Sequence, residues 1–323
     1  MNLPPLDLGQ LVGQSQARPG VLLAVGLAAL AYLLGTRRAP GWPAGRTLSF
    51  LGGLVVVLVA TCSGIEPYGH VLEWMHMMEH LLLIMVAPVL LAIGSPLQLA
   101  SDALPARGAA AWRAFLDRPV IGWLTSPVAA AGLYAICVIG VHLTGVMDSA
   151  MDDQGVHVTE ELAYLASGML LFQLVFGRRP GPWQLSGGGR LALLALVTPV
   201  DTVVGVVLLQ TGTVEGGLAA GHGHGHARPS WALSASADTV AAGTTMWILG
   251  TGIMALLMLA VGLVWLHGRA PVAVAPGWTE RARLAAMAER TGEPERDDRD
   301  LDSDDDALDA YNRWLAKMAE RDR

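Results

Sequence analysis

Two histidines and a methionine stand at helical spacing at the head of an otherwise apolar segment, EWMHMMEHLLLIM, which runs from Glu73 to Met85. At about 100° per residue, one face of a helix here carries Glu73, His76, Met77 and His80. The two imidazoles lie one turn apart, so both can reach one metal ion. The other polar or sulfur-bearing side chains are expected to point elsewhere: Met75, Met78 and Glu79. The spacing predicts a metal-binding helix face rather than an isolated interfacial histidine.

A second group of such residues lies in GVHLTGVMDSAMDDQGVHVTEELAYL, from Gly140 to Leu165. His142 falls about one turn before the end of one expected helix. One face of the next helix carries His157, Glu160, Glu161 and Tyr164. Glutamates in a first turn also complement the helix dipole, and this alone would explain both. The dipole does not explain why these histidines come to the same depth as His76 and His80, so the pattern predicts four histidines in one layer on three helices.

Two further acids and one loop have alternative interpretations. Asp238 opens SADTVAAGTTMWILG, where it fits an N-cap and a ligand or ligand-orienting residue equally well. Asp201 lies near the middle of an apolar run, where an acid is a functional candidate by default, although Pro199 beside it could mark a broken helix that it caps. The loop GHGHGH, residues 221–226, could collect metal or be a low-complexity insertion.

The ligand types favour copper. Imidazole suits copper and zinc, whereas thioether sulfur selects Cu(I). Several methionines cluster near the histidines in the sequence: Met75, Met77, Met78, Met85, Met147 and Met151. Methionine is also an ordinary core residue, so the sulfur content favours copper without proving it.

These residues must be positioned by membrane-spanning helices. The chain has 323 residues, of which 53% are hydrophobic and 15% charged, with a mean hydropathy of +0.45, which excludes a soluble domain. Seven uncharged runs approach the ~20 residues that a helix needs to cross hydrocarbon: 20–36, 46–63, 74–93, 120–146, 157–176, 190–211 and 239–266. The prediction is an all-α, polytopic membrane domain with seven transmembrane helices over residues 1–267, followed by an acidic, partly helical cytoplasmic tail over 268–323.

The distribution of arginines predicts the orientation. Three alternate loops carry nine of them: Arg37, Arg38, Arg46, Arg107, Arg113, Arg118, Arg178, Arg179 and Arg190. The opposite side carries Arg18 and Arg228, so the positive-inside rule places the N-terminus outside and the C-terminus in the cytoplasm. Eight of the nine histidines then lie on the outer half: His70, His76, His80, His142, His157, His222, His224 and His226. This surface attracts cations and offers metal ligands, and the charge pattern gives no indication of nucleic-acid binding.

The motifs resemble one membrane protein family. MHMMEHLLLIMVAPVLLAIGSPLQL resembles the third-helix signature of the seven-helix CtaG family, the assembly factors of caa-type cytochrome c oxidase. VHLTGVMDSAMDDQGVHVTEELAYLASGML is similar to the next segment of that family, and DTVAAGTTMW to its last helix. The resemblance covers roughly residues 20–266. Where the family usually has a histidine after the glutamate, this chain has HVTEE, so Glu161 occupies the second position of the motif.

The resemblance implies a bacterial plasma-membrane protein, not an enzyme, that handles copper at the outer face to mature a cytochrome c oxidase. Its expected partners are an oxidase subunit or a copper chaperone on the outer face, and the lipid bilayer. Residues and resemblance together predict a copper site made of His76, His80, His142 and His157, with Met77, Glu161 and Asp238 in or beside it.

Three other functions remain open. HMMEH fits the H-x-x-E-H pattern of zinc metalloproteases, in which two histidines bind zinc and the glutamate activates water, although such an enzyme also needs a cleft and a distal carboxylate ligand. A haem-b cytochrome could use His80 and His142 as axial ligands. A copper permease would need polar groups below the outer layer, for which Asp201 is the best candidate.

Overall fold

The computed structural model describes residues 3–144, 146, 153–178, 183–213 and 228–267, together with isolated positions between 286 and 320. It divides the chain into two compact units, Met1–Leu263 and Val264–Arg323. In the second unit, the described positions beyond residue 267 are helical. Met147, Met151, the GHGHGH loop and most of the predicted acidic tail lie outside the described residues.

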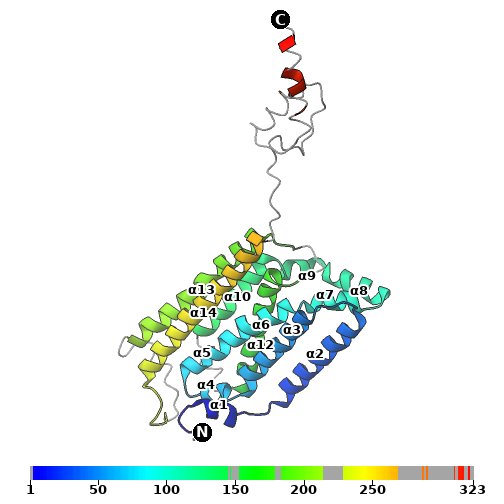
Figure 1. Ribbon diagram of the computed structural model, residues 1–323. Coiled ribbons are helices and arrows are strands. Elements are labelled where there is room, and N and C mark those ends of the chain that lie inside the picture. Colours follow the sequence, from blue (N-terminus) through cyan, green and yellow to red (C-terminus); the bar gives the residue numbers. More distant parts are fainter. Residues whose placement is uncertain are drawn as a thin grey trace. The chain divides into compact units, whose positions relative to one another are not determined.

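The first unit is built from helices, and no strand occurs among the described residues (Figure 1). Its elements are α1 (Leu8–Gly13), α2 (Pro19–Arg38), α3 (Ala44–Cys62), α4 (Ile65–Gly69), α5 (Glu73–Leu81), the π-helical turn η1 (Leu82–Val86), α6 (Ala87–Ile93), α7 (Pro96–Ala103), α8 (Ala106–Leu116), α9 (Pro119–Leu124), α10 (Pro127–His142), α12 (Gln154–Val175), α13 (Gly187–Thr213) and α14 (Ala235–His267).

Within the described part of the chain, six helical stretches are long and apolar enough to cross a membrane: α2, α3, the run Glu73–Ala103, α12, α13 and α14. The predicted span 120–146 is divided into α9 and the 16-residue α10. α9 ends at Leu124, with Thr125 as its C-cap. Ser126 caps α10 by accepting a hydrogen bond from Ala129 N, and Pro127 occupies the first turn of α10, where its missing N–H costs nothing. The chain is therefore an all-helical, multi-pass membrane protein.

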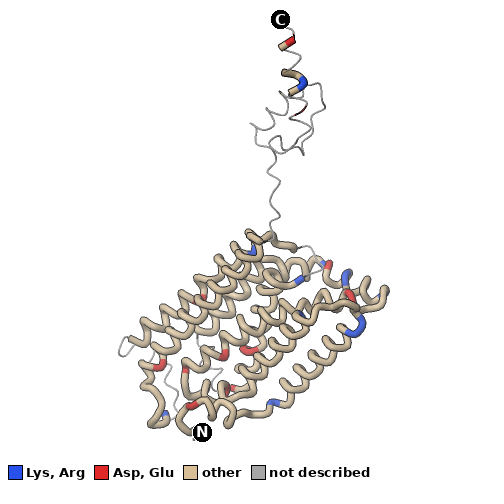
Figure 2. Tube along the Cα trace, in the orientation of Figure 1, with Lys and Arg blue, Asp and Glu red and all other residues tan. Residues whose placement is uncertain are grey.

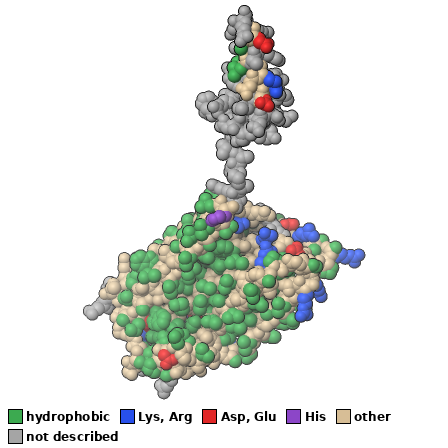
Figure 3. Space-filling view, in the orientation of Figure 1, with side chains coloured by type: hydrophobic (Ala, Val, Ile, Leu, Met, Phe, Trp, Pro, Cys, Tyr) green, Lys and Arg blue, Asp and Glu red, His purple; other side chains and the backbone are tan. Residues whose placement is uncertain are grey.

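The apolar outer surface of this unit suits lipid. Large hydrophobic side chains are exposed on separate helices, among them Leu27, Val55, Ile136 and Leu256. Figure 3 shows hydrophobic side chains spread over the face in view, with Lys and Arg confined to one part of it. Exposing such a surface to water would cost a large amount of free energy. The charged residues lie mainly at the two ends of the bundle, as they do when lipid surrounds the middle (Figure 2).

The third span is largely buried inside the bundle and contains the π-turn η1. Pro88 lacks an N–H, so the carbonyl of Ile84 loses its normal α-helical donor one turn earlier. On the facing helix, Gly168 of α12 approaches so closely that a Cβ there would collide with the Ile84 carbonyl oxygen. This backbone-to-backbone contact fixes α12 against span three and aligns the first turns of α12 with α5.

Two ends of the unit are distinguished below. The histidine end is where α5 begins and where His70, His76, His80, His142 and His157 lie. The arginine end is where α2 finishes at Arg37 and Arg38 and where α8 carries Arg107 and Arg113. Figure 2 shows acidic positions gathered near the start of α5 and basic positions near α7 and α8.

Candidate metal centre

Three helices bring their polar side chains together inside the histidine end. α5 contributes His76 and His80, α12 contributes His157, and α10 contributes its last residue, His142. These four imidazoles are only 1–2% exposed, so bulk water does not satisfy their nitrogens. A buried polar atom without a partner costs about 1–3 kcal/mol, so every nitrogen in this cluster needs a donor, an acceptor or an ion.

The carboxylate of Glu160 lies at the centre of the cluster. Its Oε1 is 3.2 Å from His80 Nε2 and 3.8 Å from His76 Nε2, and its Oε2 is 3.7 Å from His157 Nδ1. Donor atoms bound to one ion at about 2.0–2.3 Å stand roughly 3–4 Å apart, so these separations fit a shared metal ion. The ligand atoms of His76, His80 and Glu160 all lie within 4.8 Å of one another.

His142 has a fixed tautomer. Its Nδ1 donates to the carbonyl of Val138 at 2.8 Å, because a carbonyl can only accept. The Nε2 of the neutral ring is then a lone pair, and it faces His80 Nδ1 at 3.2 Å and the sulfur of Met77 at 3.1 Å. The lone pair of His142 Nε2 and the thioether sulfur beside it are donors that suit Cu(I).

A second carboxylate group surrounds His157. Its Nε2 lies 3.5 Å from Glu161 Oε1 and 3.8 Å from Glu79 Oε1. Arg18, immediately before α2, pairs with both carboxylate oxygens of Glu161. Arg18 therefore neutralises Glu161, whereas Glu79 and Glu160 have no arginine or lysine paired with them among the described residues.

Unpartnered atoms in this cluster favour a bound cation. Among the described residues, no hydrogen-bond partner is found for His76 Nε2, His80 Nε2, both nitrogens of His157, and both carboxylate oxygens of Glu79 and Glu160. With neutral imidazoles, two carboxylates remain uncompensated in a buried place, where an unpaired charge is very costly. A divalent ion would balance this charge and use the free nitrogens. The residues present therefore fit a transition-metal ion.

A smaller group stands at the edge of the cluster. Glu66 of α4 and His70, which follows α4, approach each other at 3.6 Å between Oε1 and Nε2. Burial raises the pKa of the Glu66 carboxyl, but the interactions with neighbouring His70 and with the charge of Arg18 lower it more, so the net pKa is below the ordinary value. Glu66 therefore stays ionised at neutral pH.

The structure brings most of the predicted site residues together and separates one. His76, His80, His142, His157, Met77 and Glu161 contact one another within the cluster. Asp238 instead accepts hydrogen bonds from Glu73 N at 2.9 Å and Trp74 N at 3.3 Å and pairs with Arg228. It caps the N-terminus of α5, a different helix from its own, and so holds the ligand-bearing helix in place.

Two acids were missed or misplaced. The expectation that Glu79 points away from the histidines is wrong, because its buried carboxylate lies beside His157 and His76. Glu79 is three residues from His76, which is about 60° around the helix, and α5 is enclosed by other elements on several sides. The helix dipole alone would explain Glu160 in the sequence, yet in the structure Glu160 approaches three histidines, His76, His80 and His157.

We expect Asp238→Ala to lower the thermal unfolding temperature, because losing the cap costs about 1 kcal/mol and leaves Arg228 without this carboxylate. Metal affinity should fall by no more than about 10–100-fold, since Asp238 orients α5 without touching the imidazoles. Thermal melts and metal titration of detergent-solubilised protein measure both quantities. Asp7→Ala is the matched control, because Asp7 caps α1, which carries no candidate ligand; equal effects of the two variants on affinity would contradict this role.

Asp201 is part of a different buried contact. It lies in α13, which continues through Pro199 from Gly187 to Thr213, so the alternative of a broken helix capped by Asp201 is wrong. The hydroxyl of Tyr134 donates to the Asp201 carboxylate at 3.0 Å, and both side chains are fully buried. Asp201 is therefore held by a neutral partner rather than by a histidine.

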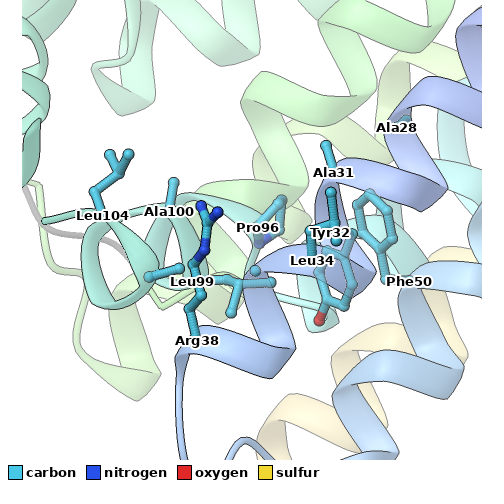
Figure 4. A pocket seen from close by; sticks show the side chains of 12 residues that line it. Ala28, Ala31, Tyr32, Leu34, Arg38, Phe50, Pro96, Leu99, Ala100 and Leu104 are labelled. Carbon is cyan, nitrogen blue, oxygen red and sulfur yellow. The ribbon is translucent and has the colours of Figure 1, made fainter.

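A cavity of about 480 Å³ lies between α2, α3 and α7, near the arginine end. Its lining is apolar apart from Tyr32 and the guanidinium of Arg38, and Figure 4 shows Arg38, Leu99 and Phe50 around it. None of its lining residues is a histidine or an acid. The lining of this cavity suits an apolar group.

The fold and the site together define a class: an all-helical, multi-pass membrane protein with a histidine and carboxylate cluster buried at one end of its bundle. Comparison with known families gives a more specific result. The family model of the cytochrome c oxidase caa3 assembly factor (Caa3_CtaG) matches residues 30–268, and the chain belongs to this family. The predicted resemblance is confirmed.

The chain is also similar to longer mycobacterial proteins. It is 30% identical over 309 residues to an uncharacterized protein of Mycobacterium bovis and to one of Mycobacterium tuberculosis, and 28% identical over 307 residues to one of Mycobacterium leprae. These matches cover 92–93% of this chain but only 43% of each relative, so the chain spans less than half the length of the relatives it matches. No solved structure matches the chain.

Proposed function

We propose that this protein binds copper in the buried cluster and supplies it during the assembly of a cytochrome c oxidase. The observation that carries the proposal is the group of unpartnered imidazole nitrogens, from His76, His80 and His157, gathered around the Glu160 carboxylate. Membership of an oxidase assembly family makes copper the relevant cargo, since the oxidase contains that metal. Met77, whose sulfur lies 3.1 Å from His142 Nε2, adds the thioether donor that favours copper over zinc.

The direct test is metal analysis and X-ray absorption of the purified, copper-loaded protein. The expected spectrum has a first shell dominated by imidazole nitrogen, with a sulfur contribution from Met77. A first shell without imidazole would refute the proposed site. The role proposed for the protein is binding and delivery, with no bond in a substrate being made or broken.

The orientation and the seventh span belong to the same proposal. α10 packs against α12 and α13 inside the bundle and exposes apolar Ile136 to the surroundings, as a membrane-crossing helix does, although it has only 16 residues. We propose that α10 completes seven spans, with the histidine end outside and the acidic tail, 268–323, in the cytoplasm. The protein would then lie in the bacterial plasma membrane and meet an oxidase subunit or a copper chaperone at its outer face.

A reporter active only in the cytoplasm should work when fused after Arg269 or after Arg118 and fail when fused within 212–236 or after Ser149. The reason is that positive-inside bias places the arginine end in the cytoplasm. The pair at 118 and 149 tests α10 alone, because equal activity at both would mean that α10 does not cross. Activity within 212–236 and none after Arg269 would invert the protein and place the cluster on the wrong side.

One observation favours a second function, a zinc metalloprotease. The distal carboxylate that the HMMEH motif requires is present, because Glu160 lies beside both His76 and His80. The cleft is the weak point of this alternative, since these three side chains and Glu79 are at most 4% exposed and leave no access for a peptide. We favour the copper-binding function for that reason.

Glu79→Gln separates the two functions. A protease would keep its metal and lose turnover completely, because the glutamate activates the attacking water. An assembly factor should keep oxidase activity near the parental level, with metal affinity reduced at most about 10–100-fold through the neighbouring His157. Oxidase activity in cells that carry only the variant, compared with its metal content, is the measurement. Full loss of oxidase activity with unchanged metal content would support the protease.

A further inference from the structure

The metal cluster is sealed, so its cargo needs a way in. His76, His80, Glu79 and Glu160 are 0–4% exposed. α4 covers them: a Cβ on Gly69 would lie 3.5 Å from the Cα of His76 and 3.7 Å from a carboxylate oxygen of Glu79. The cover is fastened to the N-terminal segment, because the hydroxyl of buried Tyr68 donates to the carbonyl of Pro4. A metal ion that enters from this side therefore has to pass α4 to reach Glu160.

His70 lies beside this cover and is the partly exposed member of the histidine group. Its side chain is 23% exposed, and its Nε2 is 3.6 Å from Glu66 Oε1. Its ring centroid is 5.3 Å from that of His157, which is buried. The ligand atoms of Glu66, His70 and His157 lie within 4.8 Å of one another, a spacing that one ion can bridge.

His157 connects this edge group to the interior. Both of its nitrogens lack a hydrogen-bond partner among the described residues although the side chain is 2% exposed, so an unsatisfied buried ligand faces the edge group. The same ring belongs to the internal group with Glu79 and Glu161. Glu79 in turn approaches His76 at 3.9 Å, and His76 belongs to the central group. His157 therefore links the edge group to the internal group, and the contact between Glu79 and His76 links the internal group to the central group.

We propose that Glu66, His70 and His157 form a receiving site, which captures a divalent copper ion at the edge of the protein and passes it through His157 to the central cluster. The proposal rests on the function proposed above and adds the route of entry to it. The donor set consists of imidazole and carboxylate without sulfur, which suits Cu²⁺ rather than Cu⁺. Transfer by ligand exchange needs no electron or proton source, because one ligand replaces another around the same ion.

Substitutions in the receiving site should change the rate of copper loading and leave the Kd of the central cluster unchanged. His70→Ala and Glu66→Gln should each slow copper loading at least about 10-fold, because the ion loses its first ligands at the edge. Dissociation should slow by the same factor, since the ion leaves by the route it enters, so the Kd of the central cluster and its final copper content stay at the parental values. Stopped-flow loading of the purified full chain with Cu²⁺, followed by equilibrium titration, measures both.

Two variants and one control make the result decisive. Glu66→Gln keeps the shape of α4, so slow loading in that variant cannot come from a damaged cover. His267→Ala removes an exposed histidine at the other end of α14 and should load at the parental rate. Parental loading rates in both receiving-site variants, or faster loading in both, would overturn the receiving site and leave the central cluster standing. A parent protein that binds no copper would overturn the proposed function, and the receiving site with it.

Discussion

Purified His80→Ala protein should retain less than about 1% of the parental copper affinity, and cells that carry it should lose cytochrome c oxidase activity while the variant stays in the membrane. His80 has two roles in the cluster: Nε2 faces Glu160 at 3.2 Å, where it can bind the ion, and Nδ1 donates to His142 Nε2 at 3.2 Å. Removing the ring therefore takes away a ligand and leaves His142 Nε2 without its donor. Loss of an outer partner alone costs about 10–100-fold in metal affinity, so loss of a ligand together with this hydrogen bond should exceed that range.

The matched control for His80→Ala is His267→Ala. His267 is exposed, and it is the last residue of α14, a helix that contributes no histidine to the cluster. It should bind copper and support the oxidase like the parent. Added copper should partly restore oxidase activity in the His80→Ala cells, since a weakened site fills at a higher ion concentration. Parental copper binding by both His80→Ala and His142→Ala, with intact respiration, would show that the histidine layer is structural.

Helical periodicity was sufficient to predict which histidines meet. His76 and His80 are separated by four residues in an apolar run, and such spacing specifies one face whatever the neighbouring helices do. His142 is the last residue of α10 and His157 lies in the first turn of α12, and few residues separate the two helices in the sequence, so their common depth also follows from the sequence. The long apolar spans could be predicted from the length of the uncharged runs alone.

Contacts between helices could not be predicted in this way. A helical wheel gives the direction of Glu79 but not which element occupies that direction, and α4 and α12 both approach it. Asp238 was expected to cap its own helix or bind metal, whereas it caps α5, about 165 residues away in the chain. No local pattern encodes such a partner, since the contact exists only once α14 lies beside α5.

The sequence contains a local signal for the division of the predicted span 120–146, but the continuous apolar run favours a single helix. The sequence TSP before residue 128 combines an N-cap serine with a proline in the first helical turn, which is a typical helix start. The apolar residues on both sides made one continuous span of 120–146 the simpler prediction. Capping residues should therefore take precedence over an uninterrupted apolar run when they occur together.

The protonation pattern of the cluster predicts two opposite effects of Glu160→Gln: the metal-free protein is not destabilised, and copper affinity falls. With His142 donating from Nδ1 to Val138, its neutral Nε2 can only accept, so His80 donates from Nδ1. His80 Nε2 is then a lone pair that faces the Glu160 carboxylate at 3.2 Å. Two acceptors at this distance repel each other unless a cation, either a proton or a metal ion, lies between them.

A glutamine amide in place of the carboxylate would donate a hydrogen bond to His80 Nε2 and remove a buried negative charge. The metal-free Glu160→Gln protein should therefore unfold at an equal or higher temperature than the metal-free parent, since a net hydrogen bond contributes about 1 kcal/mol. Copper affinity should fall by at least about 100-fold, because the carboxylate is the common neighbour of His76, His80 and His157. Thermal melts with and without copper measure both effects on the same sample.

Glu161→Gln is the comparison variant, because it is the same chemical change one residue along α12, at a carboxylate that already pairs with Arg18. It should destabilise the metal-free protein by leaving Arg18 without a charged partner, and it should weaken copper binding less than Glu160→Gln does. In a metal site, the repulsion between Glu160 and the His80 lone pair destabilises the metal-free protein until a cation binds. A structural ion pair, in contrast, stabilises the protein in the absence of metal. If Glu160→Gln destabilises the metal-free protein as much as Glu161→Gln, then protonated histidines already balance Glu160, and the cluster is an ion-pair network rather than a copper site.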